Sequence, residues 1–329
     1  MNDYDTAGAC RNGRLFLYLG MLKIDPPPPP PGAAPMSAAT AQLWLPRPAL
    51  SSCVRAVMSR DTRSVPLRED ERYNHFPATP ACSLVWYFTG EAEVLRAHQP
   101  ARADSPGVPL PDRITFCGPF TRPVISRNPG PIHAMILMLM PDALALMTGI
   151  DPGAFINRVV PASEVMDPAW MTMCQEVDCA TDDDARVRIM DAFLTPRWQQ
   201  SRPDADSPTR FFLDWSHNLA LRAGTSGLGR SLRQVERRIK QWTGQPLREL
   251  RGLGRSEQAF FDAVVAGRSG NVNWSDVASN TGFADQSHLC RQTRRLTGFP
   301  PQELRRRIFA DESFWAYRLW GFSESELPD

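Results

Sequence analysis

Two similar stretches near the end of this 329-residue chain carry arginine and glutamine side chains, and one arginine recurs at the same position in both. Residues 231–244 read SLRQVERRIKQWTG, and residues 285–298 read DQSHLCRQTRRLTG. Aligned at an offset of 54 residues, both have an Arg at the same place and end in Thr-Gly-x-Pro. Arginine can bind guanine O6 and N7 with two hydrogen bonds, and glutamine can bind adenine N6 and N7 in the same way. The chemistry that these residues offer is the reading of base edges in a DNA major groove.

The spacing of apolar residues in the second stretch divides a predicted helix into a buried and an exposed face. Leu289, Thr293 and Leu296 follow one another at the spacing of a helical stripe, so we expect them to point inward. Arg291 would then reach guanine and Gln286 adenine, each pair giving ~1–3 kcal/mol of discrimination. The side chains left for base contacts on the first two turns are Gln286, Ser287, Cys290 and Arg291.

The same offset predicts the base-contacting residues of the first stretch. They are Arg233, Glu236 and Arg237, where the Glu236 carboxylate would accept from a cytosine amino group. Other cations are placed better for phosphates, which set affinity but not sequence. These are Arg238, Lys240, Arg294 and Arg295. A basic helix face exposed to solvent is the competing interpretation, and the repetition of the pattern favours DNA contacts.

Capping and turn residues predict the helices that hold these side chains. Asn273 can cap a short helix, Gly282 permits a tight turn, and Asp285 can cap the next helix. A helix that ends at glycine, with another beginning about four residues later, is the pattern of a helix-turn-helix. Residues 247–265 are the predicted linker helix between the two units, and Pro301 suits the start of a last helix. The apolar residues expected to pack against the second unit are Leu304, Ile308, Trp315 and Leu319.

A run of specific residues surrounds the second unit. It comprises Gly282-Phe283, Asp285-Gln286-Ser287-His288-Leu289, Arg291 and Gly298-Phe299-Pro300-Pro301. These residues resemble the second helix-turn-helix of the AraC/XylS family of bacterial transcription regulators, and the resemblance extends over residues 228–320. It implies an all-α domain with two helix-turn-helix units, joined by a linker helix, that binds double-stranded DNA in a sequence-specific way.

Departures from the family pattern bear on the packing of both units. Thr293 stands where the family usually has Phe, which thins the packing behind the second reader helix. Residues 223–227 are poor helix formers where the family has a regular helix, so we expect an irregular first unit. The N-terminal part matches the family's sensor domains only loosely, at residues 45–46, 117–120 and 155–160, and lacks the His/Glu metal pattern of cupins.

Charge is distributed unevenly along the chain. Residues 228–320 hold 16 Arg/Lys and 9 Asp/Glu, whereas the whole chain has a net charge of only +1. A basic segment attached to an acidic body is typical of a nucleic-acid-binding domain joined to a second domain.

Residues 37–198 are predicted to form an α+β domain, because strand-like runs come first and helices follow. The expected strands are 82–88, 113–117 and 133–140, of which the first and third would be buried on both faces. The expected helices are 143–147, capped by Asp142 and stopped by Gly149, then 167–177 and 182–193. The residues that either fill the core or line an adaptable small-molecule cavity are Met135, Met138, Met140 and Met147.

No spacing in this domain is typical of a catalytic or metal site. His75, His98 and His133 are far apart in sequence, and no phosphate loop or nucleophile elbow is present. The seven cysteines are scattered, which favours reduced thiols. No apolar run reaches the ~18 residues of a membrane helix. We therefore expect no enzyme activity, cofactor, metal or membrane partner.

The predicted organisation begins with a disordered Pro-rich leader over residues 1–36 and an α+β sensor or dimerisation domain over 37–198. A linker over 199–209, an AraC-type DNA-binding domain over 210–320 and a tail over 321–329 follow. The expected protein is a cytoplasmic, nucleoid-associated regulator that binds promoter or operator DNA. A small-molecule effector, RNA polymerase and a second copy of the chain are further candidate partners.

Two other functions remain open on the sequence alone. The N-terminal domain could be a cysteine-based enzyme or redox sensor with Cys82 or Cys117 as nucleophile, which requires a thiolate stabilised by a neighbouring charge. The chain could also be an interaction module with vestigial DNA contacts, which only the irregular first unit favours.

Overall fold

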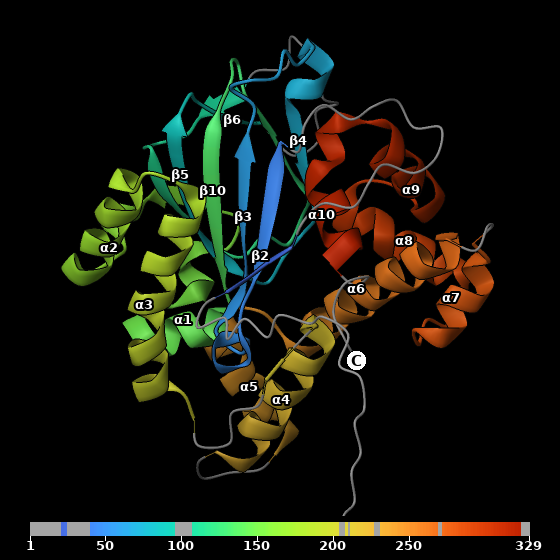
Figure 1. Ribbon diagram of the computed structural model, residues 1–329. Helices are drawn as coiled ribbons and strands as arrows, with labels where there is room; N and C mark the ends of the chain where they lie inside the picture. The colour runs from blue at the N-terminus through green and yellow to red at the C-terminus, as the bar shows by residue number, and fades with distance from the viewer. Residues whose placement is uncertain are drawn as a thin grey trace, which may run out of the picture.

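The computed structural model describes residues 21–24, 40–95, 107–203, 208–209, 211–226, 231–268 and 272–323. These residues form a β-rich N-terminal domain followed by a helical C-terminal region (Figure 1). The predicted α+β domain followed by an all-α domain is therefore confirmed.

Two antiparallel sheets make up the N-terminal domain, with strand orders β1-β2-β3-β10-β5-β8-β11 and β4-β9-β6-β7. In that order, the strands of the larger sheet are Leu22–Ile24, Ala41–Leu45, Val54–Asp61, His133–Leu139, Cys82–Thr89, Ile114–Cys117 and Val159–Pro161. Those of the smaller sheet are Tyr73–Phe76, Val124–Arg127, Glu93–Leu95 and Gly107–Pro109. The three strands predicted from the sequence are β5, β8 and β10.

Side chains along β10 alternate between two environments, because successive residues of a strand point to opposite faces of a sheet. Met135 and Leu137 are fully buried in the main core, which they share with helices α1 (Pro141–Thr148), α2 (Pro168–Cys179) and α3 (Asp183–Ser201). Ile136 and Met138 line a cavity on the other side of the sheet. The prediction that this strand is enclosed on both faces is confirmed.

Helical caps in the N-terminal domain agree with the sequence in part. Asp167 caps α2 through the N–H groups of its first turn, and Gly149 ends α1 with φ +74°. Asp142 was expected to cap α1, but Met140 holds that position and Pro141 begins the helix. The Asp142 carboxylate is buried instead against the C-terminal region, where it accepts a hydrogen bond of 2.8 Å from Trp215 Nε1.

Two predicted boundaries also differ. Helix α3 continues through Pro196 to Ser201, so the segment expected as a linker from residue 199 begins in a helix. Leu22–Ile24, expected within a disordered leader, pairs with β2 as an edge strand. The rest of that leader lies outside the described residues, apart from Met21.

The C-terminal region is entirely helical within the described residues. Short 3-10 turns occur at Pro48–Leu50, Glu69–Arg72, Pro152–Phe155 and Ala162–Glu164 in the N-terminal domain and at Glu312–Phe314 in the C-terminal region. The C-terminal helices are α4 (Phe212–Thr225), α5 (Leu232–Thr243), α6 (Leu247–Arg268), α7 (Trp274–Asn280), α8 (Gln286–Thr297), α9 (Pro301–Ala310) and α10 (Trp315–Ser323). The long helix α6 is the predicted linker helix.

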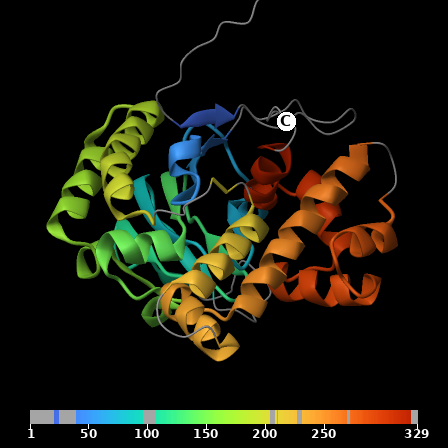
Figure 2. The ribbon, with the colours of Figure 1, turned by 90° about the horizontal axis from the view of Figure 1, so that it is seen from below.

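Helix α10 packs differently from the sequence-based expectation. Leu304 and Ile308 of α9 do lie together with Phe314 in a small cluster beside the second unit. Trp315 and Leu319 belong instead to the main core of the N-terminal domain. Figures 1 and 2 show α10 against the sheets, on the side away from α2 and α3.

Polar contacts join the two parts of the chain at several points. Arg55 of β3 pairs with Glu257 of α6 (2.6 Å), and Trp315 Nε1 donates to Asn74 Oδ1 of β4 (2.8 Å). The Glu312 carboxylate accepts from Arg60 of β3 at 2.7 Å. Because these groups are largely buried, the helical region is fixed against the sheets by specific interactions as well as by apolar packing.

Candidate nucleic-acid interface

The two reader stretches form helices of equal length, 12 residues each, at the same offset as their sequences. Both end in a glycine with left-handed backbone, φ +75° at Gly244 and +87° at Gly298. The preceding threonines make the same contacts. Thr243 Oγ1 donates to the Ile239 carbonyl at 2.8 Å and accepts from Gln245 N–H. In the same way, Thr297 Oγ1 donates to the Thr293 carbonyl and accepts from Phe299 N–H. The internal repeat of the sequence is therefore a structural repeat.

The second unit, α7–turn–α8, has the expected local structure. Asn273 accepts from Ser275 N–H at 3.1 Å, and Asp285 accepts from His288 N–H at 2.6 Å, so both predicted N-caps are present. Gly282 adopts φ +72° in the turn, a conformation that favours glycine. The turn is closed by a hydrogen bond of 2.9 Å from Phe283 N–H to the Ala278 carbonyl.

Helix α8 exposes the predicted reader face. Leu289 and Leu296 are buried, and Thr293 between them is half-buried. Cys290 is half-buried at the edge of the reader face. The exposed members of the predicted set are Gln286, Ser287, Arg291, Arg294 and Arg295. Two of these have partners in the chain: Gln286 Oε1 accepts from the Ser275 hydroxyl (3.2 Å), and Arg295 pairs with Glu249 of α6 (2.7 Å).

The three side chains predicted to read bases in the first unit are exposed, and one of them has a partner in the chain. Arg233 and Arg237 are exposed on α5. Glu236 is exposed, but its carboxylate accepts from Leu247 N–H at 3.3 Å and so caps α6. Arg238 is half-buried and donates to the Ala223 carbonyl of α4 at 2.8 Å. These two contacts tie α5 to α4 and α6.

The irregular helix expected ahead of the first unit is only partly found. Helix α4 continues through residues 223–225 to Thr225, although Gly224 lowers its intrinsic stability. Its interior is anchored by Trp215 and Leu219, which are buried in the main core, so tertiary packing outweighs the poor local propensity. Residues 227–230 lie outside the described residues.

The carboxyl end of α8 contacts the N-terminal domain directly. The backbone N–H of Ala78, just after β4, donates to the Leu296 carbonyl at 2.8 Å. Ala78, Leu253 of α6 and Leu296 also form a small apolar cluster. The second reader helix is therefore held between the linker helix and the sheet domain.

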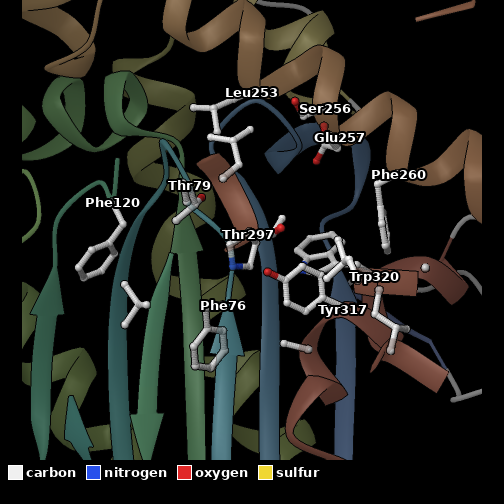
Figure 3. Close-up of a pocket in the computed structure, with 18 of the residues that line it drawn as sticks. Phe76, Thr79, Phe120, Leu253, Ser256, Glu257, Phe260, Thr297, Tyr317 and Trp320 are labelled. Carbon is white, nitrogen blue, oxygen red and sulfur yellow. The ribbon is translucent and has the colours of Figure 1, made fainter. Parts of the chain in front are cut away.

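A cavity of about 290 Å³, called the interdomain cavity below, lies between the sheets and the C-terminal helices. Figure 3 shows its aromatic lining, with Phe76 and Phe120 on the sheet side and Phe260, Tyr317 and Trp320 on the helical side. The lining residues come from segments far apart in the chain, so the sequence pattern did not reveal them. Among the four methionines considered from the sequence, Met138 lines the cavity, and Met135 and Met140 lie in the core.

Cysteine and metal chemistry find no support in the part of the chain that the structure describes. Cys117 lines the interdomain cavity, and burial raises the pKa of its thiol to about 12. Burial also raises the pKa of the Cys82 thiol, and the nearby Cys117 adds to the effect. A nucleophilic cysteine needs the opposite shift. The described residues contain no group of His, Cys, Asp and Glu that could hold a metal ion.

His133 illustrates a structural role for a buried histidine. Its Nε2 lies 2.9 Å from Asp183 Oδ1 at the start of α3, and Arg186 pairs with the same carboxylate at 2.8 Å. Burial opposes ionisation of Asp183, but its hydrogen bonds from His133 and other neighbours outweigh this and lower its pKa. The cluster joins β10 to α3.

No helix among the described residues has the length and apolar character to cross a membrane.

Comparison with known proteins gives limited information. No protein-family model and no curated protein matches the chain. Solved structures of ToxT from Vibrio cholerae do match. The apo form of a variant is 11% identical, over 75% of this chain and 95% of that chain, with a TM-score of 0.36. The wild-type protein with a bound unsaturated fatty acid is 10% identical, over 70% of this chain and 90% of that chain, with a TM-score of 0.32. At such low identity and TM-score, the likeness says nothing about what this chain binds.

Proposed function

We propose that this chain is a sequence-specific DNA-binding transcription regulator of the AraC type, controlled by a signal at its N-terminal domain. The observation that carries the proposal is the repeated reader helix. Two helices of equal length, each with a side-chain N-cap and a left-handed glycine C-cap, present an arginine at the equivalent position, Arg237 and Arg291. Buried helix pairs are common in proteins, but a repeated pair with exposed arginines on the reader face is typical of tandem DNA recognition.

Base reading is divided unequally between the two units in this proposal. Helix α8 contributes Gln286, Ser287 and Arg291, with Cys290 at the edge of its face. Helix α5 contributes Arg233 and Arg237, because the Glu236 carboxylate caps α6. Lys240 and Arg294 occupy equivalent exposed positions one turn further on and would contact phosphates. The second half-site should therefore be more strictly specified than the first.

Contacts of the N-terminal domain with both helical units support control by that domain. The Ala78–Leu296 hydrogen bond ends on the last turn of α8, and Asp142 binds Trp215 of α4 in the first unit. A signal that shifts the sheet domain would change how both readers are presented to DNA. A small-molecule effector is the candidate signal. RNA polymerase and a second copy of the chain remain candidate partners of such a regulator.

Replacement of Arg291 by alanine tests the reader assignment. With a selected binding site, Arg291→Ala should cost ~1–3 kcal/mol and relax the preference at one base pair, because a bidentate contact with guanine is lost. Arg188→Ala on α3 is the matched control, since it removes an exposed charge far from the readers in sequence. Affinities are measured for the preferred site and for sites with each base changed. Unchanged discrimination in Arg291→Ala would show that α8 does not read bases.

A further inference from the structure

We propose that the N-terminal domain forms part of the first DNA reader, with Asp142 of α1 as the residue that positions helix α5. Asp142 acts through Arg222 of α4, which stacks on Trp242 of α5. The proposal names a positioning residue for one half-site and rests on the proposed DNA-binding function. Its structural part can be tested without DNA.

The two reader helices are supported in different ways. Leu289 of α8 packs in a cluster with residues of α6 and α7, and the carboxyl end of α8 touches the sheet domain at Ala78. Helix α5 packs on the main core instead, where Ile239 is fully buried and Val235 and Trp242 lie against it. In Figure 1, α5 lies next to α1 below the larger sheet. Both readers therefore touch the N-terminal domain, but α5 does so along its inner stripe.

The end of α5 fits directly against a turn of the N-terminal domain. Gly244, which ends α5, faces Gly153 of the 3-10 turn Pro152–Phe155. A Cβ atom at Gly244 would lie 2.7 Å from the Gly153 Cα atom, closer than a Cβ atom comes to such a neighbour. At the equivalent position of α8, a Cβ atom at Gly298 would lie 3.9 Å from Pro123 Cγ, which is an ordinary contact. The backbone of the first reader is thus in direct contact with the N-terminal domain.

A buried carboxylate connects the N-terminal domain to α4. Asp142 is the second residue of α1 and is only 3% exposed. Its Oδ1 accepts from Trp215 Nε1 at 2.8 Å, and its Oδ2 accepts from Arg222 Nη2. An uncompensated charge in the interior is costly, so a carboxylate buried to this degree needs such partners. The ion pair therefore gives the Arg222 side chain a defined position relative to α1.

The Arg222 guanidinium connects this position to α5. Its Cζ lies 4.9 Å from the centre of the Trp242 ring, a distance at which a guanidinium and an aromatic ring attract each other. The Arg222 side chain is 18% exposed, so water competes little for the contact. A second bond joins the same two helices, from Arg238 Nη1 to the carbonyl of Ala223. Because Arg238 and Trp242 are one helical turn apart, α4 holds α5 at two successive turns.

The position of α5 determines where its reader side chains point. Arg233 and Arg237 are exposed on the side of α5 that faces away from the main core. Side chains that form a binding site need to be held to within ~0.5 Å and about 10–20° of the productive geometry. Without the Asp142 charge, the stacked pair of Arg222 and Trp242 loses its fixed end, and α5 can rotate. Helix α8 is supported by other residues, so its half-site should be read as before.

Hydrogen exchange of the full chain without DNA tests the positioning. Asp142→Asn keeps the shape of the side chain but removes the charge that holds Arg222. Exchange in α5 should become faster than in the unchanged protein, with little change in α8. Glu312→Gln is the control, because it removes a carboxylate that pairs with two arginines beside α9 and α10, and it should not favour α5 over α8. Equal acceleration in both reader helices of Asp142→Asn, or none in α5, would overturn the proposal.

Binding to selected DNA sites tests the effect on base reading. In the unchanged protein, a base change in either half-site should weaken binding. In Asp142→Asn, base changes in the half-site of α5 should lose about fivefold of their effect, the smallest discrimination expected of one bidentate arginine contact. Base changes in the half-site of α8 should keep their effect. Equal losses in both half-sites would show a general loss of structure and would overturn the positioning role.

Arg222→Lys provides a second variant that changes the stacking rather than the ion pair. Lysine keeps a charge for Asp142 but lacks the flat guanidinium that stacks on Trp242. The same selective losses are expected, and this variant takes the place of Asp142→Asn if that protein does not fold. Full discrimination in the α5 half-site of Arg222→Lys would refute the route through Trp242. If the unchanged protein bound DNA without sequence preference, the proposed function would fail, and the exchange result would decide the positioning by itself.

Discussion

Glu312 forms the most heavily charged contact between the helical region and the sheet domain. Its carboxylate accepts from Arg60 (2.7 Å), from Arg318 (2.6 Å) and from Thr40 (3.3 Å). The Arg60 and Arg318 side chains are only 3% and 8% exposed. Burial lowers the pKa of both guanidinium groups, and the Glu312 charge partly offsets this. Both cations pair directly with this carboxylate.

Glu312→Gln removes that charge and leaves the shape nearly unchanged. Breaking a buried pair by removing one partner typically costs ~3–5 kcal/mol, because the remaining charge stays buried without compensation. Since Glu312 itself is 19% exposed, we expect the lower end, about 3 kcal/mol. At an unfolding entropy of ~2.1 cal/mol/K per residue, this 329-residue chain shifts by about 1.5 °C per kcal/mol, so the unfolding midpoint should fall by roughly 4 °C.

The assay is thermal and urea unfolding of the full chain, with a matched control. Glu303→Gln also removes a carboxylate that pairs with two arginines, Arg306 and Arg307, but these groups are considerably more exposed. It should leave the midpoint unchanged. Arg60→Met combined with Glu312→Gln should be less destabilised than the sum of the single changes, since the charge left unpaired is removed. A Glu312→Gln midpoint equal to that of the control would refute this account of the domain contact.

Two further predictions concern a buried histidine and the cations of α5. His75 is stacked on Phe314 (ring centroids 4.4 Å), and burial, aided by the Arg307 charge, lowers its pKa to about 4. The unfolded chain then binds a proton that the folded chain does not, so stability should fall by about 3 kcal/mol as pH drops from about 6.5 to 4. His75→Phe should remove that part of the slope in urea titrations at each pH, and an unchanged slope would contradict the assignment. Lys240→Ala should reduce the salt dependence of DNA binding by about one ion with little change in stability. Arg238→Ala should instead lower the unfolding midpoint, because its hydrogen bond to the Ala223 carbonyl is lost, and the reverse pattern would refute the division of roles.

Local signals in the sequence predicted local structure well. The caps at Asn273 and Asp285, the turn at Gly282 and the repeated ends at Gly244 and Gly298 are all present. Each depends on residues within a few positions along the chain, because a cap or a left-handed glycine is determined by its own turn. The same is true of the strands β5, β8 and β10, whose apolar runs are long enough to identify them.

Partners distant in sequence were not predictable from these patterns. The exposed position of Glu236 follows from helical periodicity, but the bonds of Glu236 to Leu247 and of Arg238 to Ala223 depend on how neighbouring helices are placed. Trp315 and Leu319 were correctly expected to be buried, but they lie on a helix separate from Leu304 and Ile308 and pack in the main core. An apolar stripe shows that one face of a helix is buried, but it does not identify the element against which that face packs.

The interdomain cavity was the least predictable feature. Its walls come from both sheets and from α6, α8, α9 and α10, which no single stretch of sequence brings together. One signal was nevertheless visible: Thr293 interrupts the apolar stripe of α8 between Leu289 and Leu296. A small residue in place of a large one at a packed position indicates either weaker packing or a space that something else fills.

The central claim is that two reader helices contact DNA in successive major-groove segments. Selection of bound DNA from a random pool by the full chain tests it most directly. We predict a split site, with half-sites about 10 bp apart, in which the half-site assigned to α8 is the more strictly specified. Arg291→Ala should relax the base preference in that half-site alone. Arg237→Ala should relax the base preference in the other half-site alone. Enrichment of no sequence, or of one unsplit half-site unaffected by either change, would contradict the account.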